Sequence, residues 1–173
     1  MRRALMLVDW QERLFPVMEE SRRDDALRAA VNLRWLAGEL GLPVLASEQY
    51  PQGLGPTLPQ LTVEDAVPKL SFSAMGEPAF VERVRADAAD EWVVCGMETH
   101  ICVAQTVLDL RAAGQSVRVV ADATLSRRPL DWQLGLDRMR LAGAAVDSAE
   151  GVLFAWLGRA GGPLFKELSR RIR

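Results

Sequence analysis

The fold of this chain is decided by the stretch Trp92-Val93-Val94-Cys95-Gly96-Met97-Glu98-Thr99-His100-Ile101-Cys102-Val103. Its first four residues form a continuous apolar run, which is typical of a strand buried on both faces, and Gly96 ends that run. A helix is expected to begin near Ile101, with Thr99 as its N-cap. A buried strand that leads through a short turn into a helix is the unit from which parallel α/β sheets are built.

The same alternation of strands and helices extends outward in both directions. Further strands are expected at Ala4–Val8, Leu42–Ala46, Ala66–Val67, Val117–Ala121 and Ala144–Val146. Helices are expected at about 26–40, 78–89 and 129–142, and from about 151 to 172 with an interruption at 161–163. Residues 48–64 carry three prolines and two glycines and predict a long ordered loop. The pattern predicts an α/β fold, a parallel sheet with helices on both faces.

Length and composition narrow the possible classes of protein. A chain of 173 residues fits a single domain, residues 1–173. With 21 basic and 23 acidic residues, the net charge of −2 offers no electrostatic footprint for nucleic acid or an anionic membrane. No apolar stretch approaches the ~20 residues of a membrane span. Two cysteines are too few for a secreted disulfide scaffold, and the apolar run before Asp9 is too short for an export signal, so a cytoplasmic location is expected.

Polar and reactive residues gather where the expected strands end. In a parallel α/β sheet, the active site lies at the carboxyl ends of the strands. The residues at these ends are Asp9, Ser47–Tyr50, Pro68–Lys69, Gly96–Cys102 and Asp122. The sequence therefore predicts one functional site at one edge of the sheet.

Cys102 is the candidate nucleophile because it lies in the first turn of the helix expected after a buried strand. A helix N-terminus carries partial positive charge and free N–H groups, which favour a thiolate and predict a lowered pKa for Cys102. The alternative, a structural cysteine packed under the helix, stays open from position alone. Cys95 lies inside the apolar strand and is interpreted as structural. His100, the only histidine, faces another direction than Cys102, so a surface or pocket-wall position is expected rather than a Cys–His dyad.

Asp9 and Lys69 are the candidate partners of this cysteine. Asp9 follows five apolar residues, where a carboxylate often is a metal ligand or caps a helix, here one beginning near Gln11. Lys69 follows Val67-Pro68 and by itself is typical of a solvated lysine. In a site, its charge would lower the pKa of Cys102 and tune Asp9 electrostatically.

Together these residues resemble the isochorismatase-like cysteine hydrolases, a superfamily that includes nicotinamidases and carbamoylsarcosine amidohydrolases. The resemblance rests on Asp9 after the first strand, the Lys-x-x-x-Ser-Ala arrangement of residues 69–74, and residues 96–103, in the family's order and approximate spacing. Further stretches resemble the subgroup of isochorismatase domain-containing proteins, so the resemblance covers nearly the whole chain. They are residues 11–16, 48–51, 53–57, 121–123, 138–140 and 148–151.

The resemblance implies a fold and a set of roles. The fold is a three-layer α/β/α arrangement, Rossmann-like, with a six-stranded and mostly parallel sheet. Asp9 would be the general base for Cys102, and Lys69 would hold the carboxylate and thiolate in place. The backbone N–H groups of Glu98 and Cys102 would form an oxyanion hole, beside a cis peptide bond between Met97 and Glu98.

The departures from the family point to the kind of reaction. Nicotinamidases hold a metal through an aspartate and histidines after the second strand, whereas residues 47–51 read Ser-Glu-Gln-Tyr-Pro here. We therefore expect no metal site and no cofactor. Isochorismate cleavage is a vinyl-ether hydrolysis that needs no thiolate, so the presence of Cys102 favours acyl transfer. The predicted reaction is hydrolysis of a C–N bond (amide, ureide or carbamoyl) of a small molecule through a thioester.

The sequence also leads to expectations about the substrate pocket and the state of assembly. A small pocket near the strand ends is expected from Trp10, Phe15, Tyr50, Phe72 and Glu98, with core packing as the alternative for Phe15 and Phe72. A homo-oligomer is expected, and the apolar segment 152–157 is either an interface or part of the core. The alternative function is a non-catalytic binding or scaffold protein. A flavodoxin-like nucleotide-binding domain is excluded because residues 9–13 are acidic, bulky and without glycine.

Overall fold

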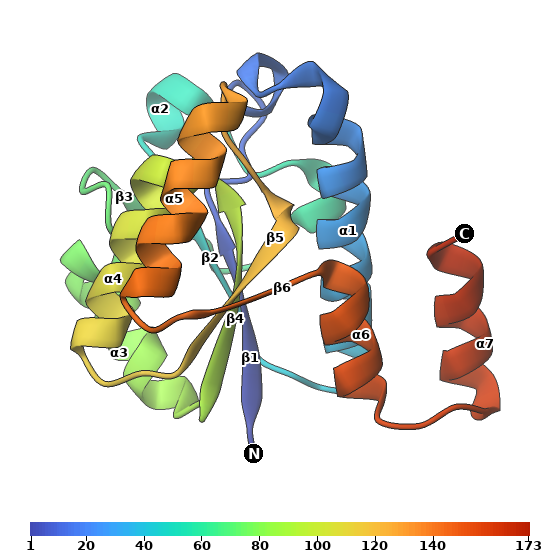
Figure 1. The fold of residues 1–173 in the computed structure, drawn as a ribbon. Helices are drawn as coiled ribbons and strands as arrows, with labels where there is room; N and C mark the ends of the chain where they lie inside the picture. Colours follow the sequence, from blue (N-terminus) through green and yellow to red (C-terminus); the bar gives the residue numbers. More distant parts are fainter.

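The computed structural model describes residues 1–173 and contains one six-stranded sheet in the order β3-β2-β1-β4-β5-β6 (Figure 1). All neighbouring strands are parallel. The strands are β1 (Arg3–Val8), β2 (Val44–Gln49), β3 (Val67–Lys69), β4 (Glu91–Met97), β5 (Val117–Leu125) and β6 (Ala145–Asp147). The α/β fold class with a six-stranded sheet is therefore confirmed.

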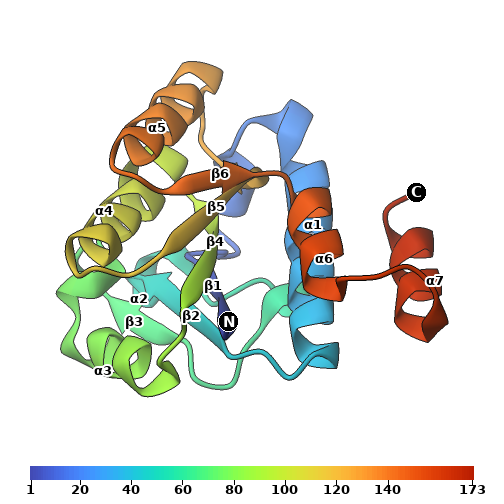
Figure 2. The same ribbon diagram turned by 60° about the horizontal axis from the view of Figure 1, so that its bottom comes forward.

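Helices cover both faces of this sheet, which gives three layers. The longer helices are α1 (Glu20–Glu39), α3 (Pro78–Asp87), α4 (Ala104–Ala112), α5 (Pro129–Leu141), α6 (Ala149–Leu157) and α7 (Gly162–Arg171). The short turns are η1 (Phe15–Val17), α2 (Pro51–Leu54), η2 (Pro59–Leu61), η3 (Ala74–Gly76) and η4 (Thr99–Val103). Helices α1 and α6 cover one face and α3, α4 and α5 the other, while α7 lies outside the α1 layer (Figure 2). None of the helices is both long and apolar enough to cross a bilayer.

The alternation of side chains along β1 explains why the strands are apolar throughout. Leu5 and Leu7 belong to a cluster of 22 buried residues on the α1 side of the sheet. Ala4, Met6 and Val8 belong to a cluster of 20 buried residues on the α4 side. Because both faces are covered almost equally, neither face of a central strand tolerates polar side chains.

The strand boundaries differ from those expected mainly at the carboxyl ends. Strand β2 runs to Gln49 instead of ending at Ala46, and β5 runs to Leu125 instead of Ala121. These extensions contain polar residues that still pair with a neighbouring strand, so an apolar pattern underestimates them. Asp122 consequently lies within β5, where its Oδ1 accepts a hydrogen bond from the Ala149 N–H at the start of α6. It does not join the predicted site, which is a correction.

The apolar C-terminal segment is buried within the same domain. Val152, Leu153 and Trp156 on α6 pack into the cluster on the α1 side. Helix α6 begins earlier than expected because the hydroxyl of Ser148 accepts a hydrogen bond from the Gly151 N–H, 3.1 Å away, and so caps the helix. Core packing therefore accounts for these three α6 residues, whereas Phe154 is exposed and its ring lies 6.4 Å from that of Phe165 on α7.

The chain reverses its direction of travel across the sheet between β1 and β4, the two central strands. From β1 the chain moves to β2 and β3 on one side, and from β4 to β5 and β6 on the other. Gly96 permits the close approach of these strands, because a Cβ atom there would collide with the carbonyl oxygen of Val8. Ligands in such sheets bind outside the carboxyl ends at this switch point.

Candidate active site

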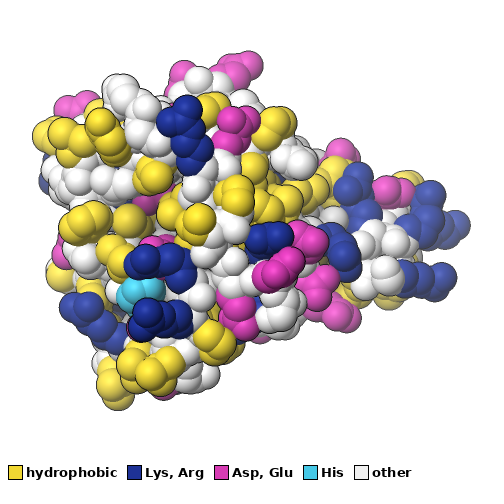
Figure 3. Space-filling view, turned by 90° about the horizontal axis from the view of Figure 1, so that it is seen from above, with side chains coloured by type: hydrophobic (Ala, Val, Ile, Leu, Met, Phe, Trp, Pro, Cys, Tyr) yellow, Lys and Arg dark blue, Asp and Glu magenta, His cyan; other side chains and the backbone are white.

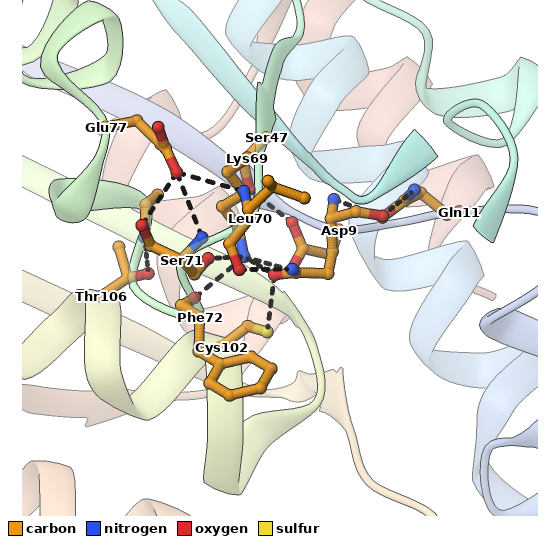
Figure 4. A network of polar contacts seen from close by, with 12 residues as sticks. Asp9, Gln11, Ser47, Lys69, Leu70, Ser71, Phe72, Glu77, Cys102 and Thr106 are labelled. Atoms are coloured by element: carbon orange, nitrogen blue, oxygen red, sulfur yellow. Dashed lines mark hydrogen bonds and ion pairs between the residues drawn. The ribbon is translucent and has the colours of Figure 1, made fainter. Parts of the chain in front are cut away.

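Three side chains from different strand ends meet at this switch point (Figure 4). Asp9 follows β1 in a left-handed conformation (φ 53°), Lys69 ends β3, and Cys102 lies in η4 after β4. Lys69 Nζ lies 2.9 Å from Asp9 Oδ2, and neither side chain has exposed surface. The predicted convergence is present in the structure, while the catalytic roles of these residues stay predictions.

The ammonium of Lys69 has a complete set of acceptors apart from Asp9. Its Nζ donates to Gln49 Oε1 (2.6 Å), to the Phe72 carbonyl (2.9 Å) and to the Ser71 carbonyl (3.2 Å). An ammonium has three hydrogens, so these three acceptors use its donor capacity. Lys69 is therefore not a solvated lysine; its buried charge is held by one ion pair and three oxygens.

Consequently, one oxygen of Asp9 keeps its lone pairs free of hydrogen bonds. Asp9 Oδ1 accepts from the Ser47 hydroxyl at 2.7 Å. Asp9 Oδ2 is buried and forms an ion pair with Lys69 Nζ, 2.9 Å away, without hydrogen-bond geometry. A buried carboxylate oxygen that is neutralised by charge but open to a proton has the properties of a general base.

Cys102 faces this carboxylate as a thiol. Its side chain is nearly buried, with 6% exposure, and Sγ donates to Gln49 Oε1 at 3.7 Å. Burial, and after it the charge of Asp9, raise the pKa of Cys102 to about 12 against the lowering effect of Lys69. The expectation that a helix N-terminus lowers this pKa is therefore wrong, because loss of water and a neighbouring carboxylate outweigh the favourable charges.

The turn that carries Cys102 differs from the expected helix start. Residues 99–103 form a π-helical turn, η4, that leads into α4, and the N-cap position falls at Glu98 rather than Thr99. Thr99 Oγ1 is buried and has no hydrogen-bond partner, so the prediction of Thr99 as N-cap is wrong. The peptide bond between Met97 and Glu98 is cis, as the family resemblance implies. The oxyanion-hole role of the Glu98 and Cys102 N–H groups stays a prediction.

Side chains around this turn fix it to the rest of the protein. The Glu98 carboxylate is nearly buried and accepts from Arg127 Nε at 3.0 Å. Gly135 on α5 allows the close contact with η4, because a Cβ there would lie 2.9 Å from His100 Cα. His100 Nδ1 contacts the Ser126 hydroxyl at 3.0 Å. Figure 3 looks down on the carboxyl ends of the strands and shows the single histidine at the surface between basic side chains.

The alternative reading of Asp9 as a helix cap is excluded. No helix begins near Gln11, and the first helical turn, η1, begins at Phe15. Gln11 is instead fully buried and forms an isolated bridge with Thr57. Asp9 therefore has no helix to cap, and its side chain is directed to Ser47 and Lys69.

The predicted aromatic pocket requires correction. Trp10 has no exposed surface and packs in the core on the α1 side, because neighbouring residues at a strand end point to opposite faces. Phe15 packs against this core, 6.3 Å from Trp10 between ring centroids. Tyr50 lines a cavity of about 330 Å³ beside β3 that does not include Cys102, and Phe72 is 56% exposed. These four residues do not form one pocket around the thiol.

Three supporting residues were given no role from the sequence. Gln49 contacts both Lys69 and Cys102 through its amide oxygen. Gln11 holds the backbone of Gln49 from both sides, donating to its carbonyl (2.9 Å) and accepting from its N–H (2.8 Å). Glu77 accepts two backbone N–H groups and a hydroxyl from residues 70–71, the loop that supplies carbonyls to Lys69.

Glu77 also shows an electrostatic consequence of this arrangement. The backbone N–H of Ser71, then its hydroxyl, lower the pKa of Glu77, with a further contribution from the Leu70 N–H. A carboxylate that receives several hydrogen bonds stays ionised and anchors a loop. In the sequence, Glu77 was marked only by its place directly before the helix expected from residue 78. No group of three or more His, Cys, Asp or Glu side chains comes together in a metal-binding arrangement.

Comparison with known proteins agrees with this fold. Residues 3–151 match the family model of the isochorismatase domain. Isochorismatase domain-containing protein 2 of Xenopus laevis is 38% identical over 98% of this chain and 82% of its own length. The structure of MAR1 ribonuclease from Caenorhabditis elegans superposes with a TM-score of 0.88 at 31% identity, covering 99% of this chain and 89% of that one.

A bacterial structure adds a second fold match. The ycaC gene product of Escherichia coli, described as an octameric hydrolase of unknown specificity, has a TM-score of 0.83 at 28% identity. The match covers 88% of this chain and 78% of that one. The chain therefore belongs to the isochorismatase family, whose hydrolase fold it shares.

Proposed function

We propose that this protein is a cysteine-dependent hydrolase that cleaves a C–N bond of a small amide, ureide or carbamoyl compound through a thioester. One observation carries the proposal: a buried carboxylate oxygen of Asp9 that accepts no hydrogen bond lies in one cluster with the Lys69 ammonium and the Cys102 thiol. The Lys69 ammonium 2.9 Å away balances the charge of that oxygen and leaves it able to accept a proton from the thiol.

In the first step, Cys102 loses its proton only as it attacks. A thiol whose pKa is raised to about 12 is protonated at neutral pH, so a standing thiolate is rare. Asp9 Oδ2 takes the thiol proton while Sγ bonds to the substrate carbonyl carbon. The charge that develops on the carbonyl oxygen is received by the backbone N–H groups of Glu98 and Cys102.

In the second step, the tetrahedral intermediate collapses to products. The C–N bond breaks, the proton held by Asp9 passes to the leaving nitrogen, and an acyl or carbamoyl thioester remains on Cys102. Water, deprotonated by Asp9, then attacks the thioester carbonyl. The acid is released and the proton returns to Sγ, which restores the thiol. Throughout, Lys69 stays positively charged beside Asp9 and balances the charge on either partner.

We further propose a small-molecule substrate rather than RNA, although one structural relative is named a ribonuclease. Cys102 is only 6% exposed, so a polymer backbone cannot reach its sulfur without rearrangement. The net charge of −2 does not favour a polyanion. A homo-oligomer is proposed from the octameric relative, and a cytoplasmic location from the two unpaired thiols.

The experiment is a hydrolysis screen over amides, ureides and carbamoyl compounds, with RNA as a separate arm. Release of ammonia or amine by the parent, its absence in Cys102→Ala, and a covalent adduct on Cys102 by mass spectrometry are the expected results. Cleavage that survives in Cys102→Ala would exclude the thioester route. If no compound is turned over and no adduct forms, the alternative of a non-catalytic scaffold becomes the better explanation.

A further inference from the structure

Gln49 is the one side chain that contacts both Lys69 and Cys102 without carrying a charge of its own. Its Oε1 accepts from Lys69 Nζ at 2.6 Å and from Cys102 Sγ at 3.7 Å. Its Nε2 donates to the Leu70 carbonyl at 3.0 Å. Each polar atom of this amide therefore has a partner, and its oxygen lies between the cation and the thiol.

The orientation of the amide follows from chemistry. Lys69 has only donors, and the thiol is a donor in its resting state, so the group that faces them must be an acceptor. The Leu70 carbonyl accepts only, so it requires the NH₂ group. A flipped amide would place donors against donors on one side and acceptors against acceptors on the other.

The backbone that carries this amide is also held in place. Gln11, fully buried, bonds both the N–H and the carbonyl of Gln49, and its Nε2 also donates to the Gly55 carbonyl at 2.8 Å. Gln49 pairs with Lys69 in the β2–β3 register. A glutamine whose main chain and side chain are both fixed can set the direction of a neighbouring ammonium.

We infer that Gln49 is a positioning residue: by taking one Lys69 hydrogen, it keeps Asp9 Oδ2 open to receive the Cys102 proton. This inference rests on the proposed function. With three acceptors in place, Lys69 has no hydrogen left for Asp9 Oδ2. Without Oε1, the released N–H would turn to Asp9 at 2.9 Å, and the thiol would lose its acceptor.

The test measures the labelling rate of Cys102 with iodoacetamide at pH 8 by mass spectrometry, which needs no substrate. In Gln49→Met, we expect labelling to rise about threefold to tenfold. The reason is that a hydrogen bond to the neutral thiol is lost and the Asp9 charge is damped by Lys69. In Gln49→Glu, an oxygen acceptor is kept and charge is added, so labelling should be no faster than in the parent.

Two controls separate positioning from packing. Gln60→Met makes the same chemical change at an exposed glutamine and should leave Cys102 labelling unchanged. Fully buried Cys95 reports on the fold, since its labelling should stay slow in every variant. If Gln49→Met exposes Cys95, Gln49→Asn, an amide one methylene shorter, replaces it with the same expected rise.

Two results would overturn the inference. One is labelling in Gln49→Met, or in Gln49→Asn where that variant replaces it, that equals the parent. The other is an equal rise in that variant and in Gln49→Glu, because loosened packing moves both variants in the same direction. Failure of the hydrolysis screen leaves this measurement interpretable, so the two proposals can fail separately.

Discussion

The two cysteines lie seven residues apart on one strand-turn unit, and their surroundings differ in kind. Cys95 belongs to the core on the α1 side of the sheet, and Cys102 to the cluster on the α4 side. Burial raises the pKa of each thiol to about 12. For Cys95 the charge of Asp122 also raises the pKa, whereas for Cys102 the charges of Asp9 and Lys69 act in opposite directions.

The comparison teaches that a perturbed thiol is not by itself a reactive one. The pKa of each thiol is raised, so ionisation at rest does not distinguish the two cysteines. What distinguishes Cys102 is a base with a free oxygen and a cation that balances the charge once the proton moves. Reactivity is therefore a property of the cluster and of the moment of attack.

The largest expected effect tests the difference between Cys102 and Cys95 directly. Replacing Cys102 with Ser should reduce turnover of any substrate found in the screen roughly 10⁴-fold or more, because the nucleophile is lost. Cys95→Ala should change turnover only a few-fold, since Cys95 contacts no site residue. Steady-state kinetics on both folded variants checks this. Equal loss in the two variants would remove the distinction between the cysteines.

The second effect separates proton transfer from thiol reactivity. Asp9→Asn should lower turnover about 10²-fold to 10⁴-fold, the usual contribution of a general base. The same variant should label faster at Cys102, because the Asp9 charge raises the pKa of that thiol. Turnover and pH-dependent alkylation are measured on one preparation, with Cys95 as the internal reference. A variant that turns over normally would exclude Asp9 as the base.

The fold was predictable from the sequence because the strands are buried on both faces. Continuous apolar runs such as residues 92–95 identify the strands. In the structure, the strand that contains this run pairs in parallel with both of its neighbours. The ends of β2 and β5 were not predictable by the same means, since Gln49 and Asp122 are polar residues inside strands. Gln49 belongs to its strand through pairing with Lys69 of β3, and Asp122 lies in an irregular stretch of β5 between residues that pair with β4; no local pattern records either.

The site was predictable from the sequence only for residues with reactive or charged side chains. Asp9, Lys69 and Cys102 carry reactive groups at strand ends, so position and residue type together predicted their meeting. Gln49 has a neutral amide side chain, and its proposed role depends on which hydrogen-bond donors surround it in space. The protonation of Cys102 was wrongly predicted because the sequence shows a helix start but neither the burial of the thiol nor its distance from a carboxylate.

The third effect tests the Lys69 ammonium, a cation that acts on Cys102 but not on Cys95. Lys69→Met should slow labelling of Cys102 about tenfold near neutral pH, because Lys69 lowers the pKa of this thiol. It should also destabilise the protein by roughly 3–5 kcal/mol, since Asp9 is left as an unpaired buried charge. Alkylation rates and denaturant unfolding measure the two consequences. Unchanged labelling of Cys102 in a folded variant would show that the ammonium does not act on the thiol.

The smallest effect concerns Cys95 and appears only at alkaline pH. A thiol in the unfolded chain ionises near pH 8.5, whereas the folded pKa of Cys95 is raised to about 12. Between these values the folded state binds a proton that the unfolded state has lost. The stability contributed by the buried thiol is therefore complete below about pH 8.5 and is lost as pH rises towards 12.

Cys95→Ala removes this titration and leaves all other ionisable groups in place. From pH 8 to pH 9.5, the free energy of unfolding of the parent should fall about 1 kcal/mol more than that of Cys95→Ala. Denaturant unfolding at matched ionic strength measures the difference, in which the titration of other groups cancels. Parallel pH curves would mean that Cys95 ionises alike in both states. Its burial would then explain neither its expected slow labelling nor its contrast with Cys102.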